Sequence, residues 1–236
     1  KKQADGSFAK IEVRKRPGTV GICAAIMQHY NVDPVPHLIC GGFTREETEN
    51  ALIDLAFLGF DNVLVLRGDA PKNETFFEPE QGGNHYAIDL LKQVVDLNHG
   101  LYLEEEVKDP GNAQFCIGVA GYPEKHFEAP NKSTDLAYLK AKVDAGAEYV
   151  VTQMFFDNQK YFEFVESCVA AGINVPIIPG LKPITNKKQM SLLPRIFHVD
   201  LPTDLSGEIM KCKSDADVEL VGTEWLLNQS RELKKA

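Results

Sequence analysis

The feature that most restricts how this chain can fold is a repeated unit in which an amphipathic helix passes through a glycine into a short apolar run. The unit reads DAGAEYVV at 144–151 and AAGINVPII at 170–178, with a varied copy, FLGFDNVLVL, at 57–66. Glycine ends helices readily because it adopts positive φ without steric cost. Alternating helices and strands of this kind predict βα units around a parallel sheet.

Five short runs rich in Val, Ile and Leu are predicted to be strands. Each is apolar on both faces, as in a parallel sheet that is covered by helices. They span residues 35–40, 62–66, 115–120, 149–153 and 175–180. The repeat favours an α/β fold of the (β/α)8 TIM-barrel type over an open doubly wound sheet. About five of the eight βα units are then represented.

Helix signals fill the stretches between these runs. Thr44 followed by Glu47 forms a capping-box pattern that predicts a helix start. Gly146 and Gly172 are predicted helix stops, and residues 218–236 are expected to be one helix. We therefore expect 1–236 to be a single incomplete barrel domain, with 1–16 a polar excursion or hairpin and 17–236 the barrel units.

Composition excludes several classes of function. The chain has 236 residues, 44% of them hydrophobic, and a net charge of −9. This charge argues against nucleic-acid or anionic-membrane partners, but leaves room for a local basic pocket. No apolar run approaches the ~20 residues of a membrane span. The five cysteines form no CxxC pair, which favours packed thiols in a cytoplasmic protein over a metal site.

Polar residues follow the predicted strands, where a βα barrel places its active site. Residues 67–69, Arg-Gly-Asp, follow the second run, and Tyr122 and His126 follow the third. Gln153 ends the fourth, and its amide must be hydrogen-bonded if it is buried. The first run contains His37 and leads into residues 40–42, Cys-Gly-Gly, and the fifth leads into residues 179–183, Pro-Gly-Leu-Lys-Pro. Five strand ends with this character form a pattern that an isolated Arg-Gly-Asp turn lacks.

Each of these residues also has a purely structural interpretation. Arg67 and Asp69 could form a local ion pair or a turn, and His37 could be a core histidine. Lys142 could be a solvated helix charge, and Tyr122 could simply fill the core. No phosphate-binding glycine loop, metal-binding histidine pair or nucleophile elbow is present. What remains is a wide polar opening at the carboxyl ends of the strands, lined by hydrogen-bonding groups and aromatic rings. Such an opening suits a large planar heterocyclic cofactor.

Five linked motifs make the interpretation more specific. PHLIC, LRGD, GYPEKHFEAP, KVDAGAEYVVTQMFFD and IIPGLKPITNKKQ resemble the 5,10-methylenetetrahydrofolate reductase family, in order and over nearly all of residues 17–235. The resemblance implies a (β/α)8 barrel that carries FAD. It also implies reduction of a small-molecule folate to 5-methyltetrahydrofolate in one-carbon and methionine metabolism. NADH or NADPH would donate the hydride in a ping-pong reaction, and the protein would form homo-oligomers.

The resemblance also assigns roles to single residues. Those expected to contact FAD are His37, Arg67, Gly68, Asp69, Tyr86, Ala87, Tyr122, His126, Ala129, Asp135 and Lys142. Lys142 would make a charge-assisted contact to phosphate. Asp69, Gln153 and Gln189 would bind the folate, and Asp69 and Gln153 would be catalytic, with Gln153 also meeting the nicotinamide.

The chain also departs from the family pattern. The general-acid glutamate of the first barrel strand, the second strand and the last strand have no counterpart here, and Tyr138 and Ala141 replace more polar residues. We expect the chain to be the middle of a barrel, and a polypeptide of these residues alone to bind FAD weakly and lack reductase activity. The alternatives are a non-catalytic flavin- or folate-binding remnant, or an aldolase-like barrel using Lys182.

Overall fold

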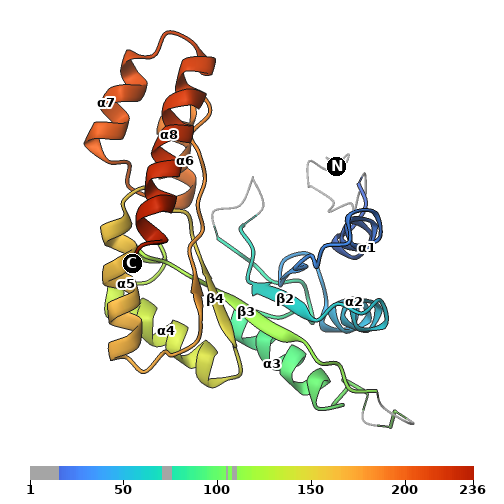
Figure 1. The fold of residues 1–236 in the computed structure, drawn as a ribbon. Coiled ribbons are helices and arrows are strands. Elements are labelled where there is room, and N and C mark those ends of the chain that lie inside the picture. Colours follow the sequence, from blue (N-terminus) through green and yellow to red (C-terminus); the bar gives the residue numbers. More distant parts are fainter. Residues whose placement is uncertain (1–15, 71–75, 105, 108–110) are drawn as a thin grey trace, which may run out of the picture.

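The computed structural model describes residues 16–70, 76–104, 106–107 and 111–236 (Figure 1). In chain order its elements are α1 Thr19–Tyr30, β1 His37–Ile39, α2 Arg45–Phe57, β2 Asn62–Leu66, α3 Ala87–Asn98, β3 Cys116–Gly121, α4 Lys132–Asp144, β4 Tyr149–Thr152, α5 Asn158–Ala170, β5 Ile177–Ile178, α6 Gln189–Phe197, α7 Thr203–Lys211 and α8 Asp215–Leu233. The hairpin considered for residues 1–16 falls, except for its last residue, outside the described part.

The five strands form one parallel sheet whose spatial order follows the sequence. The order is β1-β2-β3-β4-β5, and every neighbouring pair is parallel. A helix connects each strand to the next. This is the arrangement of consecutive βα units in a barrel wall, whereas the strand order of a doubly wound sheet reverses. The predicted fold class and all five predicted strands are confirmed.

Alternate residues along the strands divide the sheet into two unlike faces. One face is covered by the helices and the other is not. On the face without helices, Ile39 and Ile178 are 38% and 47% exposed at the two edges of the sheet. Tyr149 also lies there, and its hydroxyl donates to the carbonyl of Val63 at 2.8 Å. A Cβ on Gly118 would overlap the Tyr149 ring, so a side chain is excluded at that position. The helix-covered face is buried, and its residues include Leu38, Val63, Val65, Ile117, Val119 and Val150.

Four helices end in the same hydrogen-bonded turn. After α2, α3, α4 and α5 comes a glycine with positive φ, namely Gly59, Gly100, Gly146 and Gly172. The residue after each glycine donates its N–H to a carbonyl in the last turn, as Phe60 does to Leu55 at 3.1 Å and Ile173 to Cys168 at 2.9 Å. This is the Schellman motif. It confirms the predicted stops at Gly146 and Gly172, and the predicted capping box at Thr44 and Glu47 is also present.

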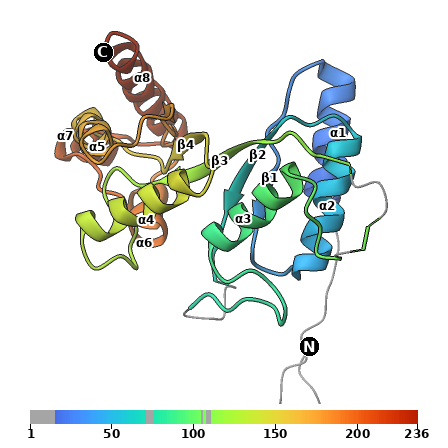
Figure 2. The same ribbon diagram turned by 90° about the horizontal axis from the view of Figure 1, so that it is seen from below.

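Helices α6–α8 gather beside α5, away from α1 and α2, as the two views agree (Figures 1 and 2). They share an apolar core of their own, made of Phe156, Ile184, Leu193, Val199, Leu205, Ile209 and Val218. Trp225 of α8 ties this group to the connection between β4 and α5, since its Nε1 donates to the carbonyl of Phe156 at 2.9 Å. The final helix was predicted. Helices α6 and α7 were missed, because each has nine residues and α6 contains Pro194.

No helix in the described part of the chain is long and apolar enough to cross a bilayer. That same part contains no group of three or more His, Cys, Asp or Glu side chains placed to hold a metal ion.

Two glycines in helices provide a test of the close packing around α8. A Cβ on Gly222 of α8 would overlap the carbonyl oxygen of Ile184, whereas Gly207 of α7 has open space around it. Gly222→Ala should destabilise the protein by about 1–3 kcal/mol because the backbone must shift. Gly207→Ala should stabilise it by about 0.5–1 kcal/mol through helix propensity. Urea unfolding of both variants measures the difference, and a Gly222→Ala variant as stable as the parent would contradict the packing.

Candidate active site

The carboxyl ends of the strands meet along one edge of the sheet, and several of the predicted site residues extend from that edge. Arg67 follows β2, Tyr122 follows β3 and Gln153 follows β4. The N–H of Gln153 donates to the carbonyl of Gly121 at 2.8 Å, which holds two of these ends side by side. The N–H of Gly180, after β5, donates to Oγ1 of Thr152 at 2.9 Å.

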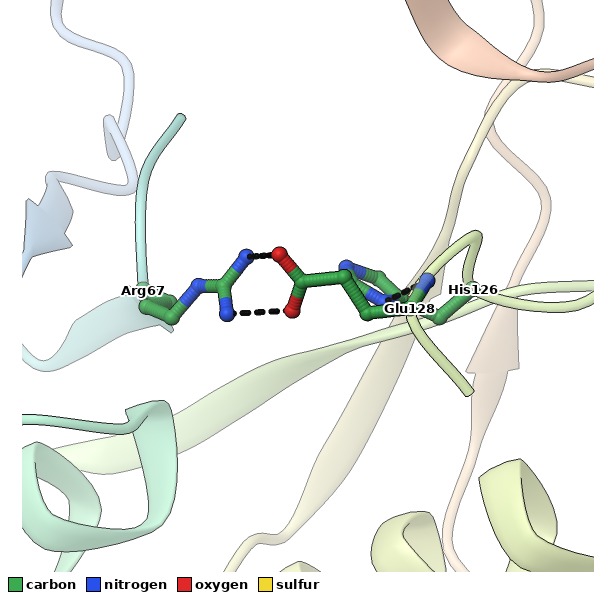
Figure 3. Close-up of polar contacts among 3 residues, drawn as sticks. All are labelled: Arg67, His126 and Glu128. Atoms are coloured by element: carbon green, nitrogen blue, oxygen red, sulfur yellow. Dashed lines mark hydrogen bonds and ion pairs between the residues drawn. The ribbon is translucent and has the colours of Figure 1, made fainter. Parts of the chain in front are cut away.

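Arg67 pairs with Glu128, in the loop that joins β3 to α4. Its Nη1 and Nη2 donate to the two carboxylate oxygens at 2.5 and 2.8 Å (Figure 3). A two-pronged pair of this geometry is stronger than a single contact. Accordingly, Glu128 raises the pKa of Arg67, and Arg67 lowers the pKa of Glu128. The side chains are 19% and 33% exposed.

The rest of Arg67 is also held in place. Its guanidinium carbon lies 5.1 Å from the centre of the Phe77 ring. Its carbonyl accepts from the N–H groups of Cys40 and Gly41, at 3.1 and 3.3 Å. Gly68 follows with a φ of +88°, a conformation that favours glycine. The Arg-Gly-Asp segment is therefore built onto the end of a core strand.

Tyr122 and His126 form an aromatic pair beside this ion pair. Their ring centres lie 4.7 Å apart in an edge-to-face arrangement. The N–H of His126 donates to Oδ2 of Asp135, in the first turn of α4, at 3.0 Å. Burial, followed by the charge of Asp135, raises the pKa of Tyr122 to about 12, while Arg67 acts in the opposite direction. The Tyr122 hydroxyl therefore stays protonated at neutral pH.

His126 is held as a neutral ring. Burial is the largest cause that lowers its pKa. Its Nδ1 accepts from the backbone N–H of Glu128 at 3.3 Å, which leaves the proton of the neutral ring on Nε2 (Figure 3). The hydrogen bond between His126 and Glu128 thus joins the Tyr122–His126 ring contact to the Arg67–Glu128 ion pair.

Lys125 shapes the loop between β3 and α4. It adopts a φ of +119°, which is uncommon for a residue with a side chain. Its ammonium donates to the carbonyl of Ala129 at 2.5 Å and to that of His126 at 3.1 Å. The backbone of this loop therefore curves around the Lys125 ammonium, which holds two of its carbonyl groups.

The far side of this loop is fastened to the turn between α6 and α7. Glu124 Oε2 accepts from the N–H of Asp200 at 2.7 Å. The Phe127 ring stacks on His198 with centres 4.7 Å apart. Burial raises the pKa of Glu124, and its Oε1 is buried with no partner among the described residues. The loop thus bridges the end of β2 and the α6–α8 group.

Lys142 is partly buried on α4 and points back to the sheet. Its Nζ donates to the carbonyl of Ala120 at 2.8 Å. Removal from water lowers its pKa to about 8, against the opposing effect of the Asp135 carboxylate. This placement removes the interpretation of Lys142 as a solvated helix charge.

The structure brings together only part of the predicted set. Arg67, Tyr122, His126, Asp135 and Lys142 lie in one connected group, and Asp69 is close enough to Tyr122 to raise its pKa.

The remaining predicted residues lie outside this group. His37 begins β1 and is exposed, while Tyr86 caps α3 and is 62% exposed, with Ala87 beside it. Gln153 turns its Oε1 to the N–H of Met154 at 2.9 Å, and Gln189 turns its Oε1 to that of Thr185 at 2.7 Å.

Three residues of the site were missed at the level of sequence. Glu128 and Lys125 lie in the segment after β3 that contributed Tyr122 and His126, so the strand-end rule could have included them. Phe77 comes from the connection between β2 and α3, and its place over Arg67 has no local sequence signal.

Comparison with known proteins identifies the family. The profile of the methylenetetrahydrofolate reductase family matches residues 7–236. The 5,10-methylenetetrahydrofolate reductase of Salmonella typhimurium is 35% identical over 222 residues, covering 94% of this chain and 68% of that protein. The probable methylenetetrahydrofolate reductase (NADPH) of Caenorhabditis elegans is 33% identical over 222 residues, covering 94% of this chain. This chain spans only 31% of the length of the Caenorhabditis protein.

A solved structure supports the fold. An uncharacterised protein from Clostridium thermocellum, which binds two copies of 5-methyl-5,6,7,8-tetrahydrofolic acid, superimposes with a TM-score of 0.58 at 16% identity. The match covers 89% of this chain and 65% of the other. With the family profile spanning nearly the whole sequence, these comparisons show that the chain belongs to the methylenetetrahydrofolate reductase family.

Proposed function

We propose that the protein containing this chain is an FAD-dependent oxidoreductase that reduces 5,10-methylenetetrahydrofolate to 5-methyltetrahydrofolate, with NADH or NADPH as electron donor. The observation that carries the proposal is a connected group in a member of this family. Arg67, Tyr122 and His126 lie at the carboxyl ends of adjacent strands, and Lys142 of α4 reaches them from the side of the helix. Cytoplasmic location, homo-oligomer formation and a place in methionine biosynthesis belong to the same proposal.

The chemistry of these side chains fits a flavin dinucleotide. The group supplies two cations, Arg67 and Lys142, for the diphosphate, and two aromatic rings, Tyr122 and His126, for flat ring systems. Asp135 offers a carboxylate to hydroxyl groups of a ribose. Gly68, His37, Tyr86, Ala87 and Ala129 complete the proposed FAD contacts. When bound, FAD would carry hydride equivalents between the nicotinamide and the folate.

The folate would bind on the same edge of the sheet. Its amide-bearing pterin would face Gln153 and Gln189, and the Clostridium protein of similar fold binds a methylated folate. The Nε2 group of Gln153 has no partner among the described residues, so it is free to donate to a ligand. Asp69 is exposed at the end of β2 and would stabilise positive charge that develops on the folate.

Flavin spectroscopy tests the proposal on the full-length protein. The purified protein should show the visible absorption of oxidised flavin, which should bleach under anaerobic NADH or NADPH. Addition of 5,10-methylenetetrahydrofolate should then restore the absorption as the flavin is reoxidised. Bleaching without reoxidation by the folate would exclude the reductase, and a protein that cannot take up FAD would exclude the flavin site as well.

The charge of Asp69 should lower the reduction potential of the flavin, since a carboxylate disfavours additional negative charge nearby. A unit charge about 8 Å away is worth about 2 kcal/mol at an effective dielectric constant near 20. Asp69→Asn should therefore raise the two-electron midpoint potential by about 45 mV. It should also slow folate reduction more than NADH oxidation. Spectroelectrochemical titration gives the potential, and equal values in the variant and the parent would contradict this role.

Binding of FAD should be coupled to proton uptake by Lys142. The pKa of this lysine is about 8, and a nearby diphosphate would raise it by favouring the ammonium form. The affinity for FAD should therefore fall as the pH rises above about 8, by up to about tenfold per pH unit. Calorimetry in buffers of different ionisation enthalpy measures the protons taken up.

Two lysine variants separate this effect from general electrostatics. Lys142→Met should bind FAD more weakly and with little dependence on pH in that range. Lys140→Met is the matched control, because Lys140 lies on the same helix but pairs with Asp144 at the surface. A Lys142→Met variant that keeps the pH dependence of the parent would assign it to another group.

A further inference from the structure

Glu128 occupies the face of Arg67 that an anionic ligand would use. Both terminal nitrogens of the guanidinium donate to its carboxylate (Figure 3). These two nitrogens form the fork that recognises carboxylates and phosphates in two-pronged fashion. A phosphate group that reaches the same nitrogens must therefore displace the carboxylate.

The loop backbone holds Glu128 in this position independently of Arg67. Lys125 closes the loop through the carbonyls of His126 and Ala129, and the N–H of Glu128 donates to His126 Nδ1. Only the side chain of Glu128 has to rotate for the carboxylate to leave Arg67. The loop can thus keep Tyr122 and His126 in place while its carboxylate moves.

The strength of the pair suits displacement. Both side chains are partly exposed, and exposed ion pairs are usually worth about 1 kcal/mol or less. A diphosphate carries more negative charge than one carboxylate, so it should win the competition for Arg67. A flavin without phosphate carries no anion that could replace the Glu128 carboxylate, so it leaves the Arg67–Glu128 pair intact.

We propose that Glu128 is an internal competitor for the anion-binding face of Arg67, which the diphosphate of the cofactor must displace on binding. This inference rests on the proposed function, since it concerns the same site. It gives Glu128 a role in specificity: the carboxylate weakens the binding of all anions to Arg67 and leaves the binding of uncharged flavins unchanged. The opposite role, in which Glu128 orients Arg67 for the ligand, predicts effects of opposite sign.

The test measures binding to the full-length protein from which bound flavin has been removed. Glu128→Gln keeps the size of the side chain and removes its charge. It should bind FAD about three- to tenfold more tightly than the parent, as measured by flavin fluorescence quenching. Riboflavin, which has no phosphate, should bind the variant and the parent equally. Equal or weaker FAD binding by Glu128→Gln would overturn the proposal.

Two further variants distinguish competition from a general change in charge. Asp144→Asn removes one negative charge from the surface of α4, where Asp144 pairs with Lys140, and should leave FAD affinity nearly unchanged. In an Arg67→Met background the Glu128→Gln change should have no effect, because nothing remains to compete for. If Glu128→Gln strengthens FAD binding equally in both backgrounds, competition at Arg67 is excluded.

Inorganic pyrophosphate separates this proposal from the flavin function. Calorimetric titration with pyrophosphate alone should show tighter binding to Glu128→Gln than to the parent. If the protein takes up no flavin but pyrophosphate binding still depends on Glu128 and Arg67 in this way, the proposed function fails while the competition stands. If FAD binds but neither anion responds to Glu128→Gln, the competition fails while the flavoprotein assignment stands.

Discussion

Parallel pairing of the five strands is the constraint on which the other features depend. Because neighbouring strands run in the same direction, all of their carboxyl ends lie at one edge, and residues distant in sequence become neighbours there. Arg67 and Glu128 are 61 positions apart, yet their side chains meet in a two-pronged ion pair. The helices enforce this direction, since each must return the chain to the opposite edge before the next strand begins.

The chemistry of the site follows from partial removal of charged groups from water. Lys142 lies against the sheet with a backbone carbonyl as its hydrogen-bond acceptor, so its pKa falls to about 8. Arg67 instead meets a carboxylate and keeps its charge. Under the proposed function, Lys142 would gain a proton when a phosphate-bearing ligand arrives, and Arg67 would exchange the Glu128 carboxylate for that phosphate. Two cations of this kind would allow an acidic chain to hold such a ligand.

Much of the fold could be predicted because its signals are local. Short apolar runs that alternate with helical patterns identified the five strands. Glycines after the helices identified the stops, since only a left-handed turn closes the 6→1 hydrogen bond there. Helices α6 and α7 were missed because they are short and stabilised by contacts with α8 and with the segment that follows β4. The candidate site could be predicted as a set of strand ends, but not as a set of contacts. The partnership of Arg67 with Glu128 and Phe77 depends on packing between distant segments.

The sequence by itself determined the βα repeat, the parallel sheet and, through linked motifs, the family. These are consequences of side-chain periodicity and backbone conformation, which act over a few residues. Only the tertiary structure decided which charges face one another. It placed Lys142 against Ala120, turned the Gln189 amide toward Thr185, and put Glu128 on Arg67. The reason is physical: the free energy of a charge depends on its burial and its neighbours, and distant parts of the chain supply both.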